Sequence, residues 1–272
     1  MRLGSESAYR TALEGWDSLL ADGGVDEVAS AREIFGVADL LDAQPTLLAV
    51  LEDSVRSADD RAQLVRQVFG SKVSGPVADL LAGLARGDWS EQGDLKVALE
   101  RLGVQTLLAG AGRMGKLEEV EDEIYDARGL LAKQRDLRLT LADQKFELPA
   151  RERLVEKVFA GETPYGVELV KRAVAKVESR PIASTLSDYL EAAADRGSHL
   201  VASVTAALPL TSEQEQRLVA VLSRKYGKDV KLHTTIDTAV IGGLRVHIGS
   251  DVIDGTLATR LAQVKEQLSN GR

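Results

Sequence analysis

The sequence predicts a mainly helical α+β protein in which two tandem helical bundles precede a small α/β domain. First, the 272 residues are 44% hydrophobic but only 4% aromatic, so the cores must consist of Leu, Val and Ala, and this composition favours helices. Second, the helical pattern of the first part returns 90 residues later. Third, the apolar spacing near the C-terminus changes from the helical to the strand period. We therefore expect domains at 1–92, 93–197 and 198–272.

The repeat holds without a gap when the chain is shifted by 90 residues. Convergent helical patterning accounts for part of such a match, but helices alone would not keep the turns and an arginine in one register. A fixed period of self-similarity is typical of a repeated unit, so we interpret the two segments as a tandem duplication. The matched positions are Ile34-Phe35 with Ile124-Tyr125, Leu40-Leu41 with Leu130-Leu131, Gln44 with Gln134, Asp53 with Asp143, Arg61 with Arg151, and Leu64-Val65 and Val68-Phe69 with Leu154-Val155 and Val158-Phe159.

Helical periodicity places the elements of the first copy. Tyr9, Leu13, Trp16 and Leu20 recur at steps of three or four residues, which predicts a helix over 5–21. Further helices are expected at about 25–41, at 47–51, from the capping residue Ser57 to Gly70, and at 77–86. A helix over 93–110 resembles the later segment 184–196, so it could close the first bundle and open the second.

The glycine-rich segment from Gly110 to Gly115 is predicted to be a flexible hinge. A phosphate-binding loop is disfavoured there because no strand precedes the segment and no Gly-Lys-Ser/Thr follows it.

The last part of the chain predicts the order β-α-β-β-β-α. Strands are expected at 199–206, 230–234, 244–248 and 252–253, where apolar residues alternate with polar ones. A helix begins at a capping box made of Ser212 and Glu215, and a final helix covers 256–268.

Bulk properties exclude several classes of function. The net charge of −8 argues against a nucleic-acid-binding surface, and the absence of cysteine excludes disulfides, thiolate metal sites and cysteine nucleophiles. No stretch approaches the roughly 20 apolar residues of a membrane span, so we expect no direct membrane insertion. The N-terminus has no apolar signal core. These features predict a soluble cytoplasmic protein that reaches a membrane complex only through partners.

Candidate chemistry is sparse. His233 and His247 lie beside Asp237 and Asp251, but a metal or general-base site needs several converging groups, so we interpret both histidines as exposed strand residues. Arg61 and Arg151 could form a docking salt bridge, a bond inside each bundle or a solvated face. No nucleophile–base pair or cofactor fingerprint is present, so no catalytic, cofactor-binding or metal-binding residue is predicted. An enzyme acting on a small molecule at His233, His247 and Asp251 is a disfavoured alternative.

One constellation is specific. It combines Pro209 after the first strand with Asp237, Gly242, Gly243, Gly249, Asp254 and Gly255, arranged as an apolar turn, an alternating strand, a glycine turn and Ile-Asp-Gly before a final helix. This pattern resembles the C-terminal signature of the delta subunit of bacterial F-type ATP synthases, the family of the mitochondrial oligomycin-sensitivity-conferring protein. We interpret the signature residues as structural turns.

The resemblance implies a non-catalytic stator subunit without a cofactor. Its expected partners are the N-terminal helices of the alpha subunits and the peripheral stalk of b subunits, at the cytoplasmic face of the cell membrane. The additional bundle resembles the long form of this subunit. Which copy would hold the alpha-subunit helices stays open, because the second copy adjoins the C-terminal domain while the first carries the Tyr9 helix. A free-standing helical adaptor in another assembly is the alternative.

Overall fold

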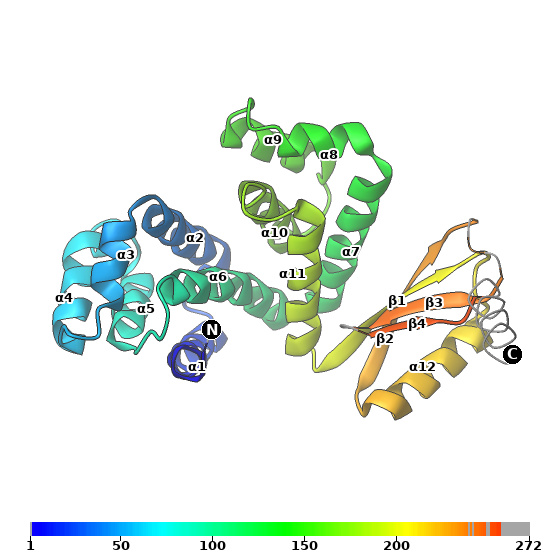
Figure 1. The fold of residues 1–272 in the computed structure, drawn as a ribbon, viewed down its shortest axis with the longest axis horizontal. Helices are drawn as coiled ribbons and strands as arrows, with labels where there is room; N and C mark the ends of the chain where they lie inside the picture. The colour runs from blue at the N-terminus through cyan, green and yellow to red at the C-terminus, as the bar shows by residue number, and fades with distance from the viewer. Residues whose placement is uncertain (1, 239, 241, 249–250, 257–272) are drawn as a thin grey trace, which may run out of the picture.

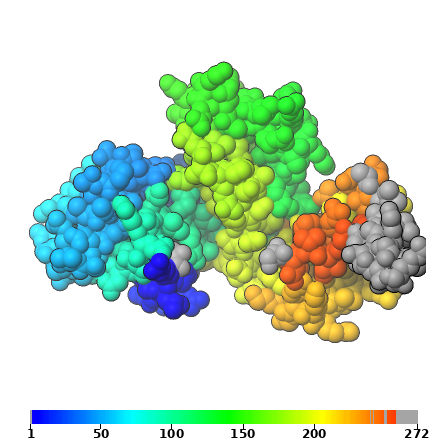
Figure 2. All heavy atoms as spheres, viewed as in Figure 1, coloured from blue at the N-terminus to red at the C-terminus, as the bar shows by residue number. Residues whose placement is uncertain are grey.

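The computed structural model describes residues 2–238, 240, 242–248 and 251–256, and it confirms a mainly helical α+β fold (Figure 1). Two helical regions are followed by a mixed β-sheet with one covering helix. The first helical region and the sheet lie at opposite ends of the molecule, and the second helical region lies between them (Figures 1 and 2).

The helices repeat as the sequence predicts. α2 and α7 begin at 27 and 117 and end at 43 and 133, and α3 and α8 begin at 45 and 135 and end at 52 and 142, so both pairs are offset by 90 residues. The turns after α3 and α8 are also alike, because the Asp53 and Asp143 carboxylates each accept a backbone N–H two residues ahead. The helices are α1 (Leu3–Ala21), α2 (Glu27–Ala43), α3 (Pro45–Glu52), α4 (Ala58–Phe69), α5 (Gly75–Arg86), α6 (Asp94–Arg113), α7 (Leu117–Lys133), α8 (Arg135–Ala142), α9 (Leu148–Val158), α10 (Pro164–Ala175) and α11 (Ile182–Arg196).

Helix α6 belongs to both helical cores. Its N-terminal half places Leu95, Leu99 and Leu102 in the first core, and its C-terminal half places Leu107 and Leu108 in the second. The expectation that this helix closes one bundle and opens the next is therefore confirmed. One continuous helix joins the two bundles, while the boundaries at 1–92, 93–197 and 198–272 stay a prediction.

The predicted hinge at 110–115 is wrong. α6 continues through Arg113, and Gly110 is buried inside it. A Cβ at Gly110 would lie 2.6 Å from Tyr165 Cε1 and 2.9 Å from Glu27 Cβ, so this glycine allows close packing rather than bending. The turn comes later, at Gly115, whose φ of 67° is in the left-handed region that favours glycine.

The C-terminal part forms a mixed sheet with strand order β2-β1-β3-β4. β1 pairs parallel with β2 and antiparallel with β3, and β3 pairs antiparallel with β4. The parallel pair requires a crossover, which α12 provides. The apolar residues Ala202, Val204 and Leu222 form the core between sheet and helix. The elements are β1 (His199–Ala206), α12 (Ser212–Tyr226), β2 (Asp229–Ile236), β3 (Leu244–Ile248) and β4 (Asp251–Asp254).

The capping box of α12 lies one residue earlier than predicted. Thr211 accepts the N–H of Gln214, and the Gln214 side chain accepts the N–H of Thr211, so the box uses this pair instead of Ser212 and Glu215. The predicted final helix beyond Thr256 lies outside the described residues. Among the residues that are described, no single helix is long and apolar enough to cross a membrane; α2 and α3 meet that criterion only as a pair, bent by 105°.

Candidate docking groove

An open groove of about 1030 Å³ lies between α1 and α5 of the first bundle. Its α5 wall is lined by Gly75, Pro76, Asp79, Leu80, Gly83, Arg86 and Gly87, and its α1 wall by Gly4, Ser7, Ala8, Thr11, Ala12, Gly15, Trp16 and Leu19. Small residues dominate both walls.

The small residues keep the groove wide. A Cβ added at Gly15, Gly75 or Gly83 would meet no atom within 4 Å. Charge is confined to the rim, where the side chains of Asp79, Arg86 and Asp88, which also lines the groove, are 76%, 44% and 93% exposed. An apolar trough with a charged rim suits the apolar face of an amphipathic helix.

The second bundle has a corresponding face on α10, and matching N-caps align α10 with α5. Glu33 on α2 accepts the N–H of Ser74 at 2.9 Å and its hydroxyl at 2.7 Å, just before α5. Glu123 on α7 accepts the N–H of Thr163 at 2.5 Å and its hydroxyl at 2.6 Å, just before α10. Ser74 and Thr163 are therefore equivalent positions, 89 residues apart (163 − 74). The 90-residue register predicted from the sequence thus ends before α5, where the second copy is one residue shorter.

This face of α10 is covered by α2 instead of being open. Counted from the caps, Asp79 and Gly83 of α5 correspond to Glu168 and Arg172 of α10. Arg32 of α2 donates to both Glu168 oxygens, with distances of 2.9 and 2.6 Å. Arg172 donates to both oxygens of Asp39 on α2, with distances of 2.7 and 2.9 Å. We call this set of contacts, Arg32–Glu168 and Arg172–Asp39, the α2 clamp.

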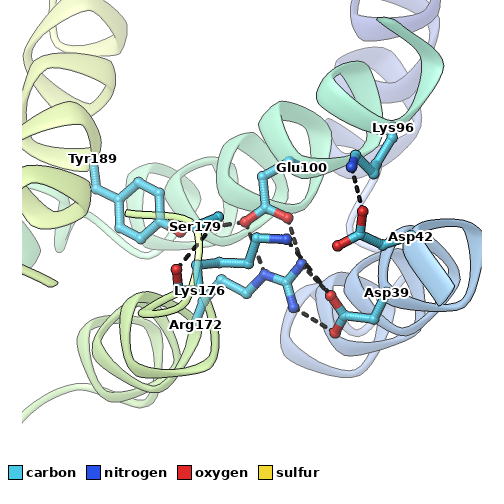
Figure 3. A network of polar contacts seen from close by, with 8 residues as sticks. All are labelled: Asp39, Asp42, Lys96, Glu100, Arg172, Lys176, Ser179 and Tyr189. Atoms are coloured by element: carbon cyan, nitrogen blue, oxygen red, sulfur yellow. Dashed lines mark hydrogen bonds and ion pairs between the residues drawn. The ribbon is translucent and has the colours of Figure 1, made fainter. Parts of the chain in front are cut away.

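Arg172 is the more buried of the two arginines in the α2 clamp, and Figure 3 shows its bonds to Asp39 and Glu100. Its side chain is only 4% exposed, and besides Asp39 it binds Glu100 of α6. Burial disfavours the charged guanidinium, but the bonds to Glu100 and Asp39 outweigh that effect and raise the pKa of Arg172. The Phe35 ring of α2 packs against the same guanidinium, 4.5 Å from centroid to Cζ. Three helices thus meet at one buried cation.

The pKa of Glu168 is also set by burial on one side and hydrogen bonds on the other. Burial opposes its ionisation, yet hydrogen bonds from Arg32 and Lys171 prevail, so the pKa of Glu168 is lowered. The carboxylate is therefore ionised at neutral pH and holds α2 electrostatically.

A second polar contact joins α7 to the sheet. The Tyr125 ring stacks on His233 with centroids 4.2 Å apart, and its hydroxyl lies 2.7 Å from Thr235 Oγ1. Nearby, His199 Nε2 lies 2.9 Å from Glu121 Oε2, and Lys231 lies 2.8 Å from an Asp122 oxygen. These contacts fix the sheet to the second bundle beside a cavity of about 580 Å³.

The expectation that His233 is exposed is wrong, because α7 covers this face of the sheet and leaves the side chain 8% exposed. Burial, followed by the charge of Lys231, lowers the pKa of His233. His247 is exposed, as predicted.

The structure does not bring His233, His247 and Asp251 together. Ser203 of β1 lies between the two histidines in register. Asp251 pairs with Ile248, the neighbour of His247, so it lies on the opposite face, where it accepts a bond from Tyr226 of α12. Within the described ranges, no group of three His, Cys, Asp or Glu is placed to hold a metal ion.

The signature residues lie at the ends of the strands. A Cβ at Gly243 would lie 2.3 Å from the carbonyl oxygen of Gly255, so this position requires glycine, and φ is 65° at Gly242 and 79° at Gly243. The N–H of Asp237 donates to the carbonyl of Ala206, and Asp254 pairs with Arg245. Pro209 is exposed after β1, and Gly249 lies outside the described residues. That these residues serve as structural turns stays a prediction.

Sequence reasoning missed the groove and the α2 clamp. A signal for the groove was present, because Ala8, Ala12 and Gly15 recur at helical spacing and place small residues on one face of α1. The α2 clamp had no local signal, since Arg32 and Glu168 are 136 residues apart.

Comparisons with known proteins relate the chain to one family. The model of the family "ATP synthase delta (OSCP) subunit" matches residues 104–268. The ATP synthase subunit delta of Beutenbergia cavernae is 38% identical over 99% of this chain and 100% of its own length. The corresponding subunits of Streptomyces avermitilis and Salinispora tropica are 36% and 38% identical over 98% and 97% of both chains. These relatives therefore share the first bundle, which precedes the part matched by the family model.

Among solved structures, a chain of the Toxoplasma gondii mitochondrial ATP synthase hexamer covers 61% of this chain and 94% of its own, at 20% identity and a TM-score of 0.38.

Proposed function

The chain belongs to the ATP synthase delta (OSCP) subunit family, and on this basis we propose that it is a non-catalytic stator subunit of an F-type ATP synthase. It links the catalytic alpha/beta head to the peripheral stalk of b subunits, so that proton-driven rotation of the rotor is coupled to ATP synthesis. It is held at the cytoplasmic face of the cell membrane by these partners. This function requires gripping surfaces rather than reactive groups.

The observation that carries the proposal is the open groove between α1 and α5. Amphipathic helices bind by laying an apolar face into such a groove, and the N-terminal helices of alpha subunits are the occupants that the family resemblance implies. The first bundle is the docking bundle in this proposal, because α2 covers the corresponding face of the second.

The b-subunit stalk is assigned to the C-terminal sheet domain. The sheet and the first bundle lie at opposite ends of the molecule (Figure 1), which separates the two attachment points. Torque must then pass along the chain without bending it. The continuous helix α6, the α2 clamp and the stacked Tyr125–His233 pair support a stiff connection.

Filling the groove tests the proposal. Gly83→Leu and Gly15→Leu each place a side chain where a Cβ meets no atom, so the fold should survive while the groove is blocked. Leucine also favours a helix interior over glycine by up to about 1 kcal/mol. We expect both variants to retain their thermal stability but to lose the head during purification from membranes, and to lose ATP-driven proton pumping in vesicles.

Gly36→Leu is the matched control, because Gly36 is also an exposed helical glycine with no atom within 4 Å of its Cβ, but it lies on α2 outside the groove. Retention of the head by both groove variants at the wild-type level would contradict head docking at this site. Affinity purification separates the adaptor alternative: a free-standing adaptor would elute without the head and b subunits, and its deletion would leave coupled ATP synthesis intact.

A further inference from the structure

Building on the proposed docking function, we infer that the helix bound between α1 and α5 runs parallel to α5 and presents a basic side chain to Asp79. The reason is that α2 already makes the equivalent complex on the second bundle. The chain therefore contains, in cis, a structural template for a contact that it makes with a partner in trans.

The first step is the match between the two faces. Five and nine positions after the cap of α10, Glu168 and Arg172 bind α2 directly. Two positions after the cap, Tyr165 packs at Gly110 of α6, where Glu27 of α2 also packs. The residues at the same three positions of α5 all line the open groove. The pairs are Tyr165 with Pro76, Glu168 with Asp79, and Arg172 with Gly83. The same helical face is used in both bundles, and only the occupant differs.

The second step concerns the relative direction of helices α2 and α10. Along α10, the contacted residues run from Glu168 to Arg172, and along α2 their partners run in the same order, from Arg32 to Asp39. α2 and α10 therefore point the same way from N- to C-terminus where they meet. A partner helix that uses the same face of α5 takes the same direction.

The third step is charge and shape. Asp79 is the α5 equivalent of Glu168, the residue that binds Arg32 in the second bundle. Its side chain is 76% exposed at the rim of the groove, and its only ion pair there is with Arg66 among the described residues, at 3.3 Å. A basic side chain of the partner fits this position. Phe35, three residues after Arg32 and so on the same face of α2, packs on Arg172. Because glycine replaces arginine at position 83, the groove leaves room there for a large apolar side chain three residues after the basic one.

Orientation can be tested by cross-linking, since the chain has no cysteine of its own. Gly75→Cys and Arg86→Cys place single thiols at the two ends of α5, which are about 16 Å apart at 1.5 Å per residue. The probe is a synthetic peptide of the alpha-subunit N-terminal helix with a cysteine at one end or the other. Disulfide formation is measured on the full chain at equilibrium with a glutathione buffer.

We expect the peptide's N-terminal thiol to pair with Gly75→Cys and its C-terminal thiol with Arg86→Cys. The crossed pairs in excess would overturn the parallel orientation while leaving docking in this groove intact. Failure of all four combinations to cross-link above an Asp136→Cys control on α8 would overturn both the orientation and the docking site. The two proposals therefore fail in different ways.

A separate test examines whether a basic side chain of the bound helix faces Asp79. Asp79→Lys should weaken binding of the same peptide by about tenfold, because a like charge then faces the partner's basic residue. Reversing that basic residue to glutamate in the peptide should restore the affinity. Asp136→Lys, the same change at an exposed position on α8, is the matched control and should bind as the wild type does. Wild-type affinity of Asp79→Lys would overturn the assigned register.

Discussion

In the first bundle, the groove face of α5 is open and lined by glycine, whereas the equivalent face of α10 in the second bundle carries Glu168 and Arg172 and is covered by α2. The helices and turns around both faces otherwise match closely. The difference shows how a duplicated bundle can be attached to its copy. In the second copy this face holds the other copy, and in the first copy the same face stays open, which is where we propose that a partner docks.

A second difference concerns the repeated arginine. Arg151 is buried and donates to three backbone carbonyls, those of Leu141, Phe146 and Val174. Arg61 is also buried, but within the described residues its Nε and Nη1 have no hydrogen-bond partner, and the Asp88 carboxylate is 3.9 Å from Nη2. The interpretation as a bond inside the bundle is confirmed for Arg151. The same residue therefore stabilises one copy and is poorly paired in the other.

The largest expected effect comes from the equivalent positions 172 and 83. Arg172→Ala leaves Asp39 and Glu100 without their shared cation. Losing one partner of a fully buried ion pair costs about 3–5 kcal/mol, and we expect a loss near the lower end because Asp39 is 49% exposed. Gly83→Ala should stabilise the chain by up to about 1 kcal/mol, because alanine favours a helix interior and a Cβ there meets nothing. Urea unfolding of the full chain measures both. Similar effects of the same sign would refute the distinction between the clamped and open faces.

The next effect separates the two arginines. Arg151→Met should cost about 2 kcal/mol, since three buried carbonyls lose a charged donor. Arg61→Met should be neutral or stabilising, because it removes buried polar atoms that lack partners. The midpoint of chemical denaturation is the readout. A loss at Arg61 as large as that at Arg151 would show that Arg61 is satisfied in solution.

Much of the fold could be predicted because the signals are local. The alternation in 199–206 predicted β1 with its observed bounds, and the repeat predicted the 90-residue offset of α2 and α7. The hinge prediction failed for a tertiary reason. A run of glycines was interpreted as a helix breaker, but Gly110 is needed where Tyr165 and Glu27 crowd the helix.

The candidate site depends on contacts between distant segments, and the sequence alone did not reveal them. His233 was expected to be exposed because it alternates with apolar residues, yet Tyr125, 108 residues earlier, covers it. The α2 clamp joins residues 133 and 136 apart. Such pairs carry no pattern in a single sequence, so the open and covered faces could be told apart only in the folded chain.

A smaller effect is expected at the glutamates that hold the two caps. Both bonds from Ser74 end on one oxygen of Glu33, so Glu33→Gln can keep them through its amide oxygen, with a loss of less than about 0.5 kcal/mol. The bonds from Thr163 use both oxygens of Glu123, so Glu123→Gln can keep the bond from the backbone N–H, but the amide must donate to the Thr163 hydroxyl, which no longer donates to a charged oxygen. We expect this exchange to cost about 1 kcal/mol or more. Thermal unfolding compares the two variants, and equal losses would contradict this difference in geometry.

The smallest effect is the pH dependence of the α2 clamp. The pKa of Glu168 is lower in the folded than in the unfolded chain, so its contribution to stability is complete above the ordinary glutamate pKa and is lost as pH falls through the folded pKa. Because Arg32 is 58% exposed, we expect this contribution to be less than about 1 kcal/mol.

Glu168→Gln should therefore be less stable than the wild type at neutral pH, and the difference should shrink between about pH 5 and pH 3. Urea unfolding of both proteins across this range isolates Glu168 from the other carboxylates, which titrate in both. Arg32→Gln is the matched partner change and should remove part of the same acid dependence. A stability difference that stayed constant down to the lowest pH would mean that Glu168 acts through packing alone, and the α2 clamp would then rest on Arg172 and Asp39.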